Sequence, residues 1–164
     1  MDGGTGALAE RLLALCRRRG LLLATCESIT GGGIGWALTA VPGASDVFRG
    51  GLITYASGLK ASLAGVDAAF IAAHGVVNER TAREMAEGAA RVCGADVAVA
   101  VTGTAGPLGQ DGVAPGTVWV GVRTPEGTRT RRLALDGDRA RIREETVRRA
   151  LRLTVEALSQ RPAP

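Results

Sequence analysis

Residues 21–33 read LLLATCESITGGG, and this stretch decides the fold because an apolar run passes directly into a polar, glycine-rich turn. The run 21–25 has the length and composition of a buried strand, and residues 26–30 form its exit. Despite its glycines, the segment 31–40 resumes apolar spacing and indicates a helix. A strand, a glycine-rich turn and a helix in this order are typical of an α/β fold.

The alternation of strands and helices continues along the chain. Helices are expected at 5–19, 60–65, 68–73, 78–93 and 138–158, and strands at 51–55, 97–101, 117–123 and 129–135. The run 97–101 is wholly apolar and is expected to be central, and the turn 124–127 joins the last two strands as an antiparallel hairpin. We therefore predict an α/β fold, a three-layer α/β/α sandwich with a mixed, mostly parallel sheet of about five strands.

The length of 164 residues suits one domain, so we expect a single domain over residues 1–164 with a frayed tail at 161–164. No apolar run reaches the ~20 residues of a membrane span, and the N-terminus has no apolar signal core. These features predict a cytoplasmic protein without membrane contact. The three cysteines are widely spaced, without a CxxC pair or a Cys/His cluster of zinc-ligand spacing, so neither a metal nor a cofactor is expected.

The charge and the aromatic content restrict the class of partner. The formal net charge is +4, and the aromatic residues are only two Trp, two Phe and one Tyr, scattered among apolar runs. A nucleic-acid binder is expected to combine a basic patch with stacking aromatics, so no nucleic-acid partner is expected. A small anionic substrate accounts for a mild basic excess equally well.

Lys60 is the only lysine among 20 Lys and Arg residues. A buried Lys can lose its proton, whereas Arg keeps it at any working pH. Ser28 follows the first buried strand, and Lys60 follows the second predicted strand, so both can lie at the carboxyl edge of the sheet. One interpretation is a serine nucleophile with a lysine base. The alternatives are a serine that only caps the turn and a lysine left by chance in an arginine-rich composition.

Other residues near this edge can complete a site. The backbone N–H groups of Thr30, Gly31, Gly32 and Gly33 can hold a phosphate or the oxyanion of a tetrahedral intermediate. Tyr55 ends the second predicted strand, where it can pass a proton to Lys60 or orient it, or else it is an ordinary strand-end aromatic.

Two later segments offer further contacts. The loop 102–116 begins with a glycine-rich turn in which Thr102 can bind a ligand, unless the glycines serve only a tight turn. Arg139 follows the expected N-cap Asp138 and would hold a phosphate bidentately, or it is simply solvated. Ser57 lies three residues before Lys60, as in penicillin-recognising enzymes, but the S-D-N and K-T-G motifs of that class are absent, so we interpret Ser57 as a loop residue.

Together these segments resemble the C-terminal domain of the competence-damage-inducible protein CinA. The matching segments run in order over nearly the whole chain: Glu27-Ser28-x-Thr30-Gly31-Gly32, Thr54-Tyr55 with Lys60, Leu63-x-Gly65-Val66, Val77-x-Glu79, Thr102-Gly103-x-Ala105-Gly106-Pro107-x-Gly109, Pro115-Gly116-Thr117-Val118-Trp119 and Gly137-Asp138-Arg139-x-x-Ile142-Arg143. The enzymatically active members of this family are nicotinamide-nucleotide amidases. The resemblance therefore implies hydrolysis of the carboxamide of nicotinamide mononucleotide to nicotinate mononucleotide and ammonia.

The resemblance also implies roles for individual residues. Ser28 and Lys60 would be the catalytic pair, with Tyr55 in the same site. Substrate contacts would come from the turn 30–33, from Arg139 and from the second glycine-rich turn, namely Thr102, Gly103, Ala105 and Gly106. The family commonly self-associates, so a homo-oligomer is expected. The larger family architecture carries an N-terminal domain resembling molybdopterin-binding proteins, for which this chain has no room, so we expect the stand-alone form.

Two departures from the family pattern keep alternatives open. Ile29 stands where Cys or Leu is common, and Ala56-Ser57 replaces Ser-Asn. If that Asn holds the ribose or orients the lysine, affinity or rate suffers. The chain would then be a catalytically silent nucleotide- or partner-binding module linked to competence or DNA damage. A third hypothesis, a general Ser–Lys peptidase or esterase, lacks support for an extended substrate groove.

Overall fold

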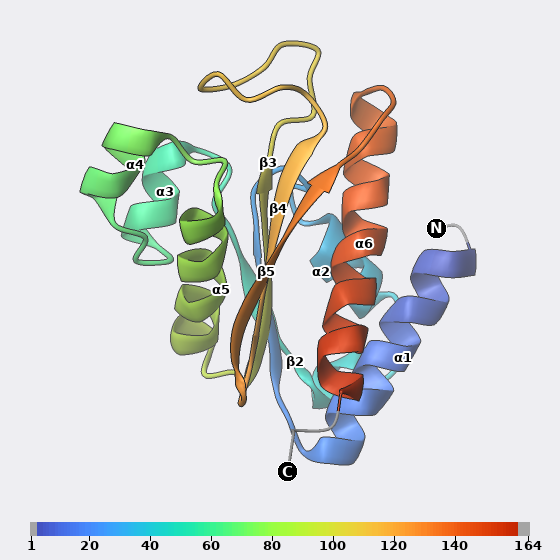
Figure 1. The fold of residues 1–164 in the computed structure, drawn as a ribbon. Helices are drawn as coiled ribbons and strands as arrows, with labels where there is room; N and C mark the ends of the chain where they lie inside the picture. Colours follow the sequence, from blue (N-terminus) through green and yellow to red (C-terminus); the bar gives the residue numbers. More distant parts are fainter. Residues whose placement is uncertain (1–2, 161–164) are drawn as a thin grey trace.

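The computed structural model describes residues 3–160, which form a five-stranded sheet between two layers of helices (Figure 1). The strands are β1 (Leu23–Glu27), β2 (Phe48–Ile53), β3 (Val97–Gly103), β4 (Thr117–Thr124) and β5 (Gly127–Ala134), in the spatial order β2-β1-β3-β4-β5. β1 pairs in parallel with β2 and β3, while β4 runs antiparallel to β3 and β5. Four of the five strands therefore point the same way, which confirms the mixed, mostly parallel sheet, and β3 is central.

The helices cover both faces of the sheet, as predicted. One face carries α1 (Gly3–Arg19), α2 (Gly33–Thr39) and α6 (Arg139–Ser159), and the other carries α5 (Glu79–Cys93) (Figure 1). The short helices α3 (Ser57–Ser62) and α4 (Ala68–His74) lie on the α5 side, and a 3-10 turn, Ala44–Asp46, precedes β2. None of the described helices is long and apolar enough to cross a membrane.

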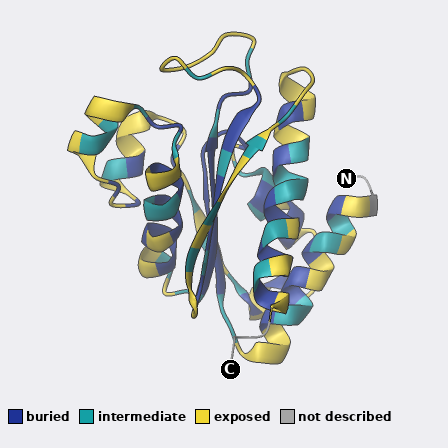
Figure 2. Cartoon of the chain, viewed as in Figure 1, coloured by how far each residue is buried: buried dark blue, intermediate teal, exposed yellow. Residues whose placement is uncertain are grey.

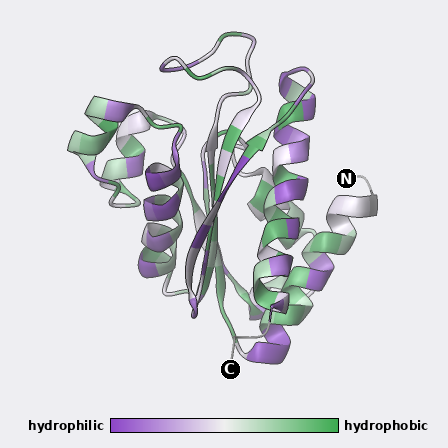
Figure 3. Ribbon diagram, viewed as in Figure 1, coloured by the Kyte–Doolittle hydropathy of each residue, from purple (hydrophilic) through white to green (hydrophobic). Residues whose placement is uncertain are grey.

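The central strands are buried on both faces, and the helices turn apolar sides towards them (Figures 2 and 3). The valines of β3 at 97, 99 and 101 belong to the cluster with α1 and α6, whereas Ala98 and Ala100 belong to the cluster with α5. This alternation follows from the period of two along a strand. Small residues let α5 approach the sheet so closely that a Cβ added to Gly121 in β4 would lie 2.3 Å from the Ala82 carbonyl oxygen.

Several boundaries differ from the predicted ones. β1 begins at Leu23 rather than at residue 21 and includes Glu27, which we expected to lie outside the sheet. The strand continues because Glu27 pairs with Ile53 of β2 and with Val101 of β3. β2 occupies 48–53 instead of 51–55, since Leu23 pairs with Phe48. The expected helix at 60–65 spans 57–62, so Lys60 lies inside it. β3 continues to Gly103, which places Thr102 in the strand rather than in a loop.

Candidate active site

The carboxyl ends of β1, β2 and β3 meet at one edge of the sheet, at the top of Figure 1. Ser28 follows β1, and its N–H donates to the Val101 carbonyl of β3 at 3.1 Å. Thr54 follows β2, and its N–H donates to the Glu27 carbonyl at 2.8 Å. These bonds continue the strand pairing one residue past the strand ends, so that Ser28 and Thr54 are placed by the sheet itself.

Lys60 points from α3 towards this edge and contacts both of these residues. Its Nζ lies 3.0 Å from Ser28 Oγ and donates to the Thr54 carbonyl oxygen at 2.7 Å. Lys60 is 1% exposed and Ser28 is 8% exposed. The structure thus brings the two residues that the sequence singled out into direct, largely water-excluded contact.

Burial controls the protonation of Lys60. Desolvation lowers its pKa from 10.5 to about 8, and the neighbouring Cys26 thiol partly opposes this change. Burial also raises the pKa of Cys26 to about 11, so the thiol is neutral at pH 7. At a pKa of about 8, roughly a tenth of Lys60 is neutral at pH 7 and about half at pH 8. A neutral amine at this distance can accept the proton of the serine hydroxyl.

Glu27 organises the connection between Ser28 and α2, a role that the sequence reasoning missed. Glu27 is 1% exposed, so its carboxylate is buried. Oε2 accepts hydrogen bonds from the Thr30 hydroxyl at 2.6 Å and from the Ile34 N–H at 2.9 Å, and Oε1 accepts from the Gly35 N–H at 2.8 Å. The protein's own carboxylate therefore occupies the N-terminus of α2, which is otherwise a site for an external anion.

We expected the N–H groups of residues 30–33 to face a ligand, but two of the four donate hydrogen bonds within the turn itself. The Gly31 N–H donates to the Ser28 carbonyl at 3.1 Å, and the Gly33 N–H donates to the Thr30 carbonyl at 3.2 Å. Within residues 3–160, the N–H groups of Thr30 and Gly32 have no hydrogen-bond partner. Gly31 and Gly32 adopt φ angles of 59° and 100°, a region that glycine enters without strain.

Arg143, which the sequence reasoning did not place near this turn, supports it from α6. Its Nε donates to the Ile29 carbonyl at 3.1 Å, and a terminal nitrogen donates to the Thr30 carbonyl at 3.2 Å. Arg143 lies four residues after Arg139, so both project from the same side of the helix. That spacing was the available signal in the sequence.

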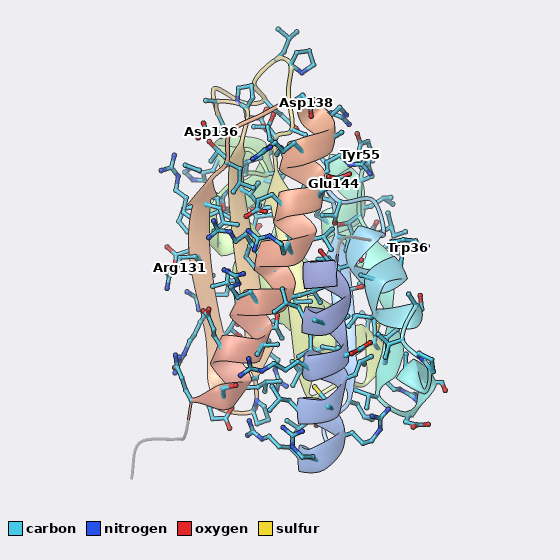
Figure 4. The ribbon with its side chains drawn as sticks, turned by 90° about the vertical axis from the view of Figure 1, so that its right-hand side faces the viewer. Trp36, Tyr55, Arg131, Asp136, Asp138 and Glu144 are labelled. Atoms are coloured by element: carbon cyan, nitrogen blue, oxygen red, sulfur yellow. The ribbon has the colours of Figure 1, made fainter. Side chains whose placement is uncertain are left out.

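Tyr55 contacts Arg139 rather than Lys60. A terminal nitrogen of Arg139 donates to the Tyr55 hydroxyl at 3.0 Å, while another donates to the Gly106 carbonyl at 3.0 Å. Tyr55 is 61% exposed, and Figure 4 shows it near the end of α6 that begins after Asp138. The expected contact of Tyr55 with Lys60 is thus absent from the described hydrogen bonds, and Arg139 instead links the β2–α3 connection to the loop after β3.

The second glycine-rich turn has mainly structural contacts. Thr102 is 1% exposed, and its hydroxyl donates to the Val76 carbonyl at 2.8 Å. A Cβ added to Gly103 would lie 2.8 Å from the Thr117 carbonyl oxygen, so this glycine permits close strand contact. Ala105 is buried, and Gly106 contributes the carbonyl that binds Arg139. In the described part of the chain no three His, Cys, Asp or Glu residues gather as a metal site would require.

A groove of about 930 Å³ borders the turn 30–33. It is lined by parts of α2, α6 and the segment after β5, including Thr30, Gly33 and Arg143, but neither Ser28 nor Lys60 lines it. Trp36, Glu144 and Asp136, labelled in Figure 4, belong to the same lining. The Ser28–Lys60 contact at the sheet edge is therefore separate from the lining of this groove.

Comparison with known proteins shows similarity to one family. The family model of the CinA C-terminal domain matches residues 5–158. The CinA-like protein of Frankia casuarinae is 45% identical over 160 residues, which cover 98% of this chain and 37% of that protein. The CinA-like protein of Gemmatimonas aurantiaca is 44% identical over 149 residues, covering 90% of this chain and 35% of that protein. The chain thus spans roughly a third of the length of these curated relatives.

Crystal structures show the same fold. The competence/damage inducible protein CihA from Agrobacterium tumefaciens superposes with a TM-score of 0.91 at 36% identity, covering 98% of both chains. The competence damage-inducible protein A (ComA) from Klebsiella pneumoniae superposes with a TM-score of 0.92 at 34% identity, covering 96% of this chain and 99% of that chain.

Proposed function

Because the chain belongs to the CinA C-terminal domain family, we propose that it is an amidohydrolase that converts nicotinamide mononucleotide to nicotinate mononucleotide and ammonia. The observation that carries this proposal is the 3.0 Å contact between Ser28 Oγ and the Nζ of a lysine that is 1% exposed. A serine hydroxyl beside a base that is partly neutral near pH 7 is a nucleophile ready for acyl transfer. The Ser28–Lys60 contact thus supports the acyl transfer, and the resemblance to the family supports the nucleotide substrate.

In the first half of the proposed reaction, neutral Lys60 takes the proton of Ser28, and Oγ forms a bond to the amide carbon. The unpartnered N–H groups of Thr30 and Gly32 stabilise the oxyanion of the tetrahedral intermediate. Protonated Lys60 then gives its proton to the amide nitrogen as the C–N bond breaks. Ammonia leaves, and the acyl group of nicotinate mononucleotide, with its ribose and phosphate, remains esterified to Ser28.

In the second half, water replaces ammonia. Lys60 takes a proton from water while the water oxygen attacks the ester carbon, and the same N–H groups stabilise the second oxyanion. Return of the proton to Ser28 Oγ releases the carboxylic acid, which then loses its proton to water. One lysine thus serves as base and acid in both halves, which suits a pKa close to the working pH.

We assign the 5′-phosphate of the substrate to Arg139. Glu27 already occupies the N-terminus of α2, so that helix end is closed to a phosphate. Arg139 binds two neutral acceptors, the Tyr55 hydroxyl and the Gly106 carbonyl, and a phosphate makes stronger, charge-assisted bonds than either. Replacing Arg139 with Ala should therefore raise the KM for nicotinamide mononucleotide more than it lowers kcat.

Ammonia release from nicotinamide mononucleotide tests the proposed reaction. Ser28→Ala and Lys60→Arg should each abolish turnover while circular dichroism shows the fold retained. Ser57→Ala is the matched control, since Ser57 is exposed and lies three residues before Lys60, and it should keep wild-type turnover. Near-normal turnover of Lys60→Arg would show that the proton-transfer role is wrong, because Arg does not release its proton.

A second candidate function is a nucleotide- or partner-binding module without catalysis, linked to competence or DNA damage. Two facts favour it: the solved relatives are described by competence and damage, and Ala56-Ser57 departs from the family pattern. Titration calorimetry distinguishes the two functions. Binding of nicotinamide mononucleotide without ammonia release, by a folded protein, would support the module and contradict the amidase.

A further inference from the structure

We infer that Glu27 is a positioning residue, which holds the turn so that Ser28 Oγ and the oxyanion-binding N–H groups face one point. This inference rests on the proposed Ser28 chemistry. Glu27 directly precedes the nucleophile, yet its carboxylate reaches forward across the turn to Thr30, Ile34 and Gly35. The three hydrogen bonds therefore hold both the start of the turn and the start of α2.

The turn needs such a clamp because of its own composition. Gly31, Gly32 and Gly33 lie between the two held ends, and glycine loses more conformational freedom on folding than any other residue. α2 is capped by Gly32, which offers no side-chain hydrogen bond. The Glu27 carboxylate thus supplies the acceptors that a Ser, Thr, Asp or Asn cap otherwise supplies.

The hydrogen bonds of Glu27 do not include Ser28 Oγ or Lys60 Nζ, the groups that exchange the proton in the proposed reaction. Its oxygens accept from one hydroxyl and two N–H groups, and the positive end of the α2 dipole favours its negative charge. Lys60 Nζ is engaged by Ser28 and by the Thr54 carbonyl. The carboxylate acts on geometry, so its removal should change the rate without moving the protonation midpoint of Lys60.

Glu27→Gln is the informative variant because it keeps the shape and removes one acceptor. An amide NH2 group would then face a backbone N–H of α2, and one of the three bonds is lost. We expect kcat for nicotinamide mononucleotide to fall about 10- to 100-fold, as for small misplacements of reacting groups. KM should change less than about threefold, and the midpoint of the pH profile should stay near the wild-type value.

A fluorophosphonate probe tests the inference without the proposed substrate. Ser28 Oγ would form a bond to phosphorus, fluoride would leave, and Lys60 would take the hydroxyl proton; mass spectrometry measures the labelling rate. Glu27→Gln should slow labelling by a factor similar to the fall in kcat. Asn78→Ala is the matched control, because it removes another side-chain cap, on α5, that accepts from the Thr81 N–H at 2.9 Å. It should lose stability yet label at the wild-type rate.

The possible outcomes separate the two proposals. Labelling of Ser28 without ammonia release would contradict the amidase, while slower labelling of Glu27→Gln would still support the inference. Wild-type labelling of a folded Glu27→Gln would overturn it, as would a wild-type protein in which Ser28 is not labelled. If Glu27→Gln fails to fold, Thr30→Val removes only the 2.6 Å hydroxyl bond and should slow labelling in the same sense.

Discussion

Lys60 combines burial with a charge that can be removed, and this should appear in the pH dependence of the reaction. Only the neutral amine can take the proton of Ser28, and burial lowers its pKa to about 8. We expect kcat/KM to rise with pH through an apparent pKa of about 8 and then to level off. Initial rates of ammonia release between pH 6 and 10 measure this. A midpoint near the ordinary Lys value would contradict the assignment of Lys60 as the base.

The same residue should link stability to pH. The folded protein loses the Lys60 proton near pH 8, whereas the unfolded chain keeps it up to about 10.5, so the unfolded state binds more protons in this window. The free energy of unfolding should therefore rise with pH between these values.

Lys60→Met tests this linkage because it is similar in size and carries no charge. We expect the wild type to gain on the order of 3 kcal/mol relative to the variant between pH 7 and pH 10.5. Urea unfolding of both proteins across this range gives the difference. A constant difference in unfolding free energy would mean that the lysine has an ordinary pKa in the folded state.

Some site residues could be found from the sequence and others could not. Ser28 and Lys60 could be singled out from the sequence. The chain has a single lysine, and a serine directly after a buried strand has few possible bases as partners. Glu27 could not be assigned, because an acidic residue inside a buried strand contradicts the polarity pattern until its hydrogen bonds to α2 are known. The partner of Tyr55 depends on where α6 begins, 84 residues along the chain, and local patterns carry no such information.

At the scale of elements, α3 matters because it carries Lys60 and begins without a side-chain cap. Its N-cap residue is Ala56, with φ −69° and ψ 142°, an extended conformation that suits a Ser cap. Ala56→Ser should stabilise the protein by about 0.5–2 kcal/mol and should not lower turnover. Thermal unfolding and ammonia release measure both effects. A loss of stability would show that the start of α3 cannot accommodate a cap.

The contact between α5 and the chain after α3 depends on Gly88. A Cβ at this position would lie 1.8 Å from the Ala64 carbonyl oxygen, an impossible distance without movement of the backbone. Gly88→Ala should therefore destabilise the protein by about 1–3 kcal/mol, although Gly→Ala in a helix usually stabilises. Gly6→Ala in α1 is the control, since nothing lies within 4 Å of its Cβ, and it should gain about 0.5–1 kcal/mol. Chemical denaturation of both variants measures the change in the free energy of unfolding. An equal increase in the two variants would contradict the tight contact at Gly88.

The order and type of the elements followed from the sequence better than their ends did. Helix ends at Asn78, Gly94 and Asp138 were correct because caps act locally. The ends of β1 and β2 were wrong by two or three residues because pairing between strands determines them. Apolar patterns show that a strand is buried, but they do not show which residues of its neighbour it meets.

For the whole molecule, the two edges of the sheet differ. β5 carries Arg129, Arg131 and Arg132 in exposed positions, and Arg131 is labelled beside this strand in Figure 4. Charged edge residues discourage pairing with another strand. β2, at the opposite edge, carries a single exposed arginine, Arg49, and Ile53 at its end is 53% exposed. We propose that the expected homo-oligomer forms here, by antiparallel pairing of β2 with the β2 of a second copy.

Ile53→Lys tests this interface by adding a charge at the proposed contact. Light scattering after size-exclusion chromatography should show a dimeric or larger wild type and a monomeric variant at the same concentration. Val92→Lys, at the end of α5 and 54% exposed in the wild type, is the control and should leave the mass unchanged. A monomeric wild type, or an Ile53→Lys variant of unchanged mass, would contradict the interface.

The support that Arg143 gives to the Ser28 turn has a consequence for synthesis of the protein on the ribosome. Ser28, Lys60 and Glu27 all leave the ribosome early, but the guanidinium that binds the Ile29 and Thr30 carbonyls belongs to α6, the last helix of the described chain. A nascent chain that ends before this helix contains Ser28 and Lys60 without the guanidinium that binds their turn. Translation therefore makes Ser28 first and completes its surroundings last, so a chain that ends before α6 should lack the proposed activity.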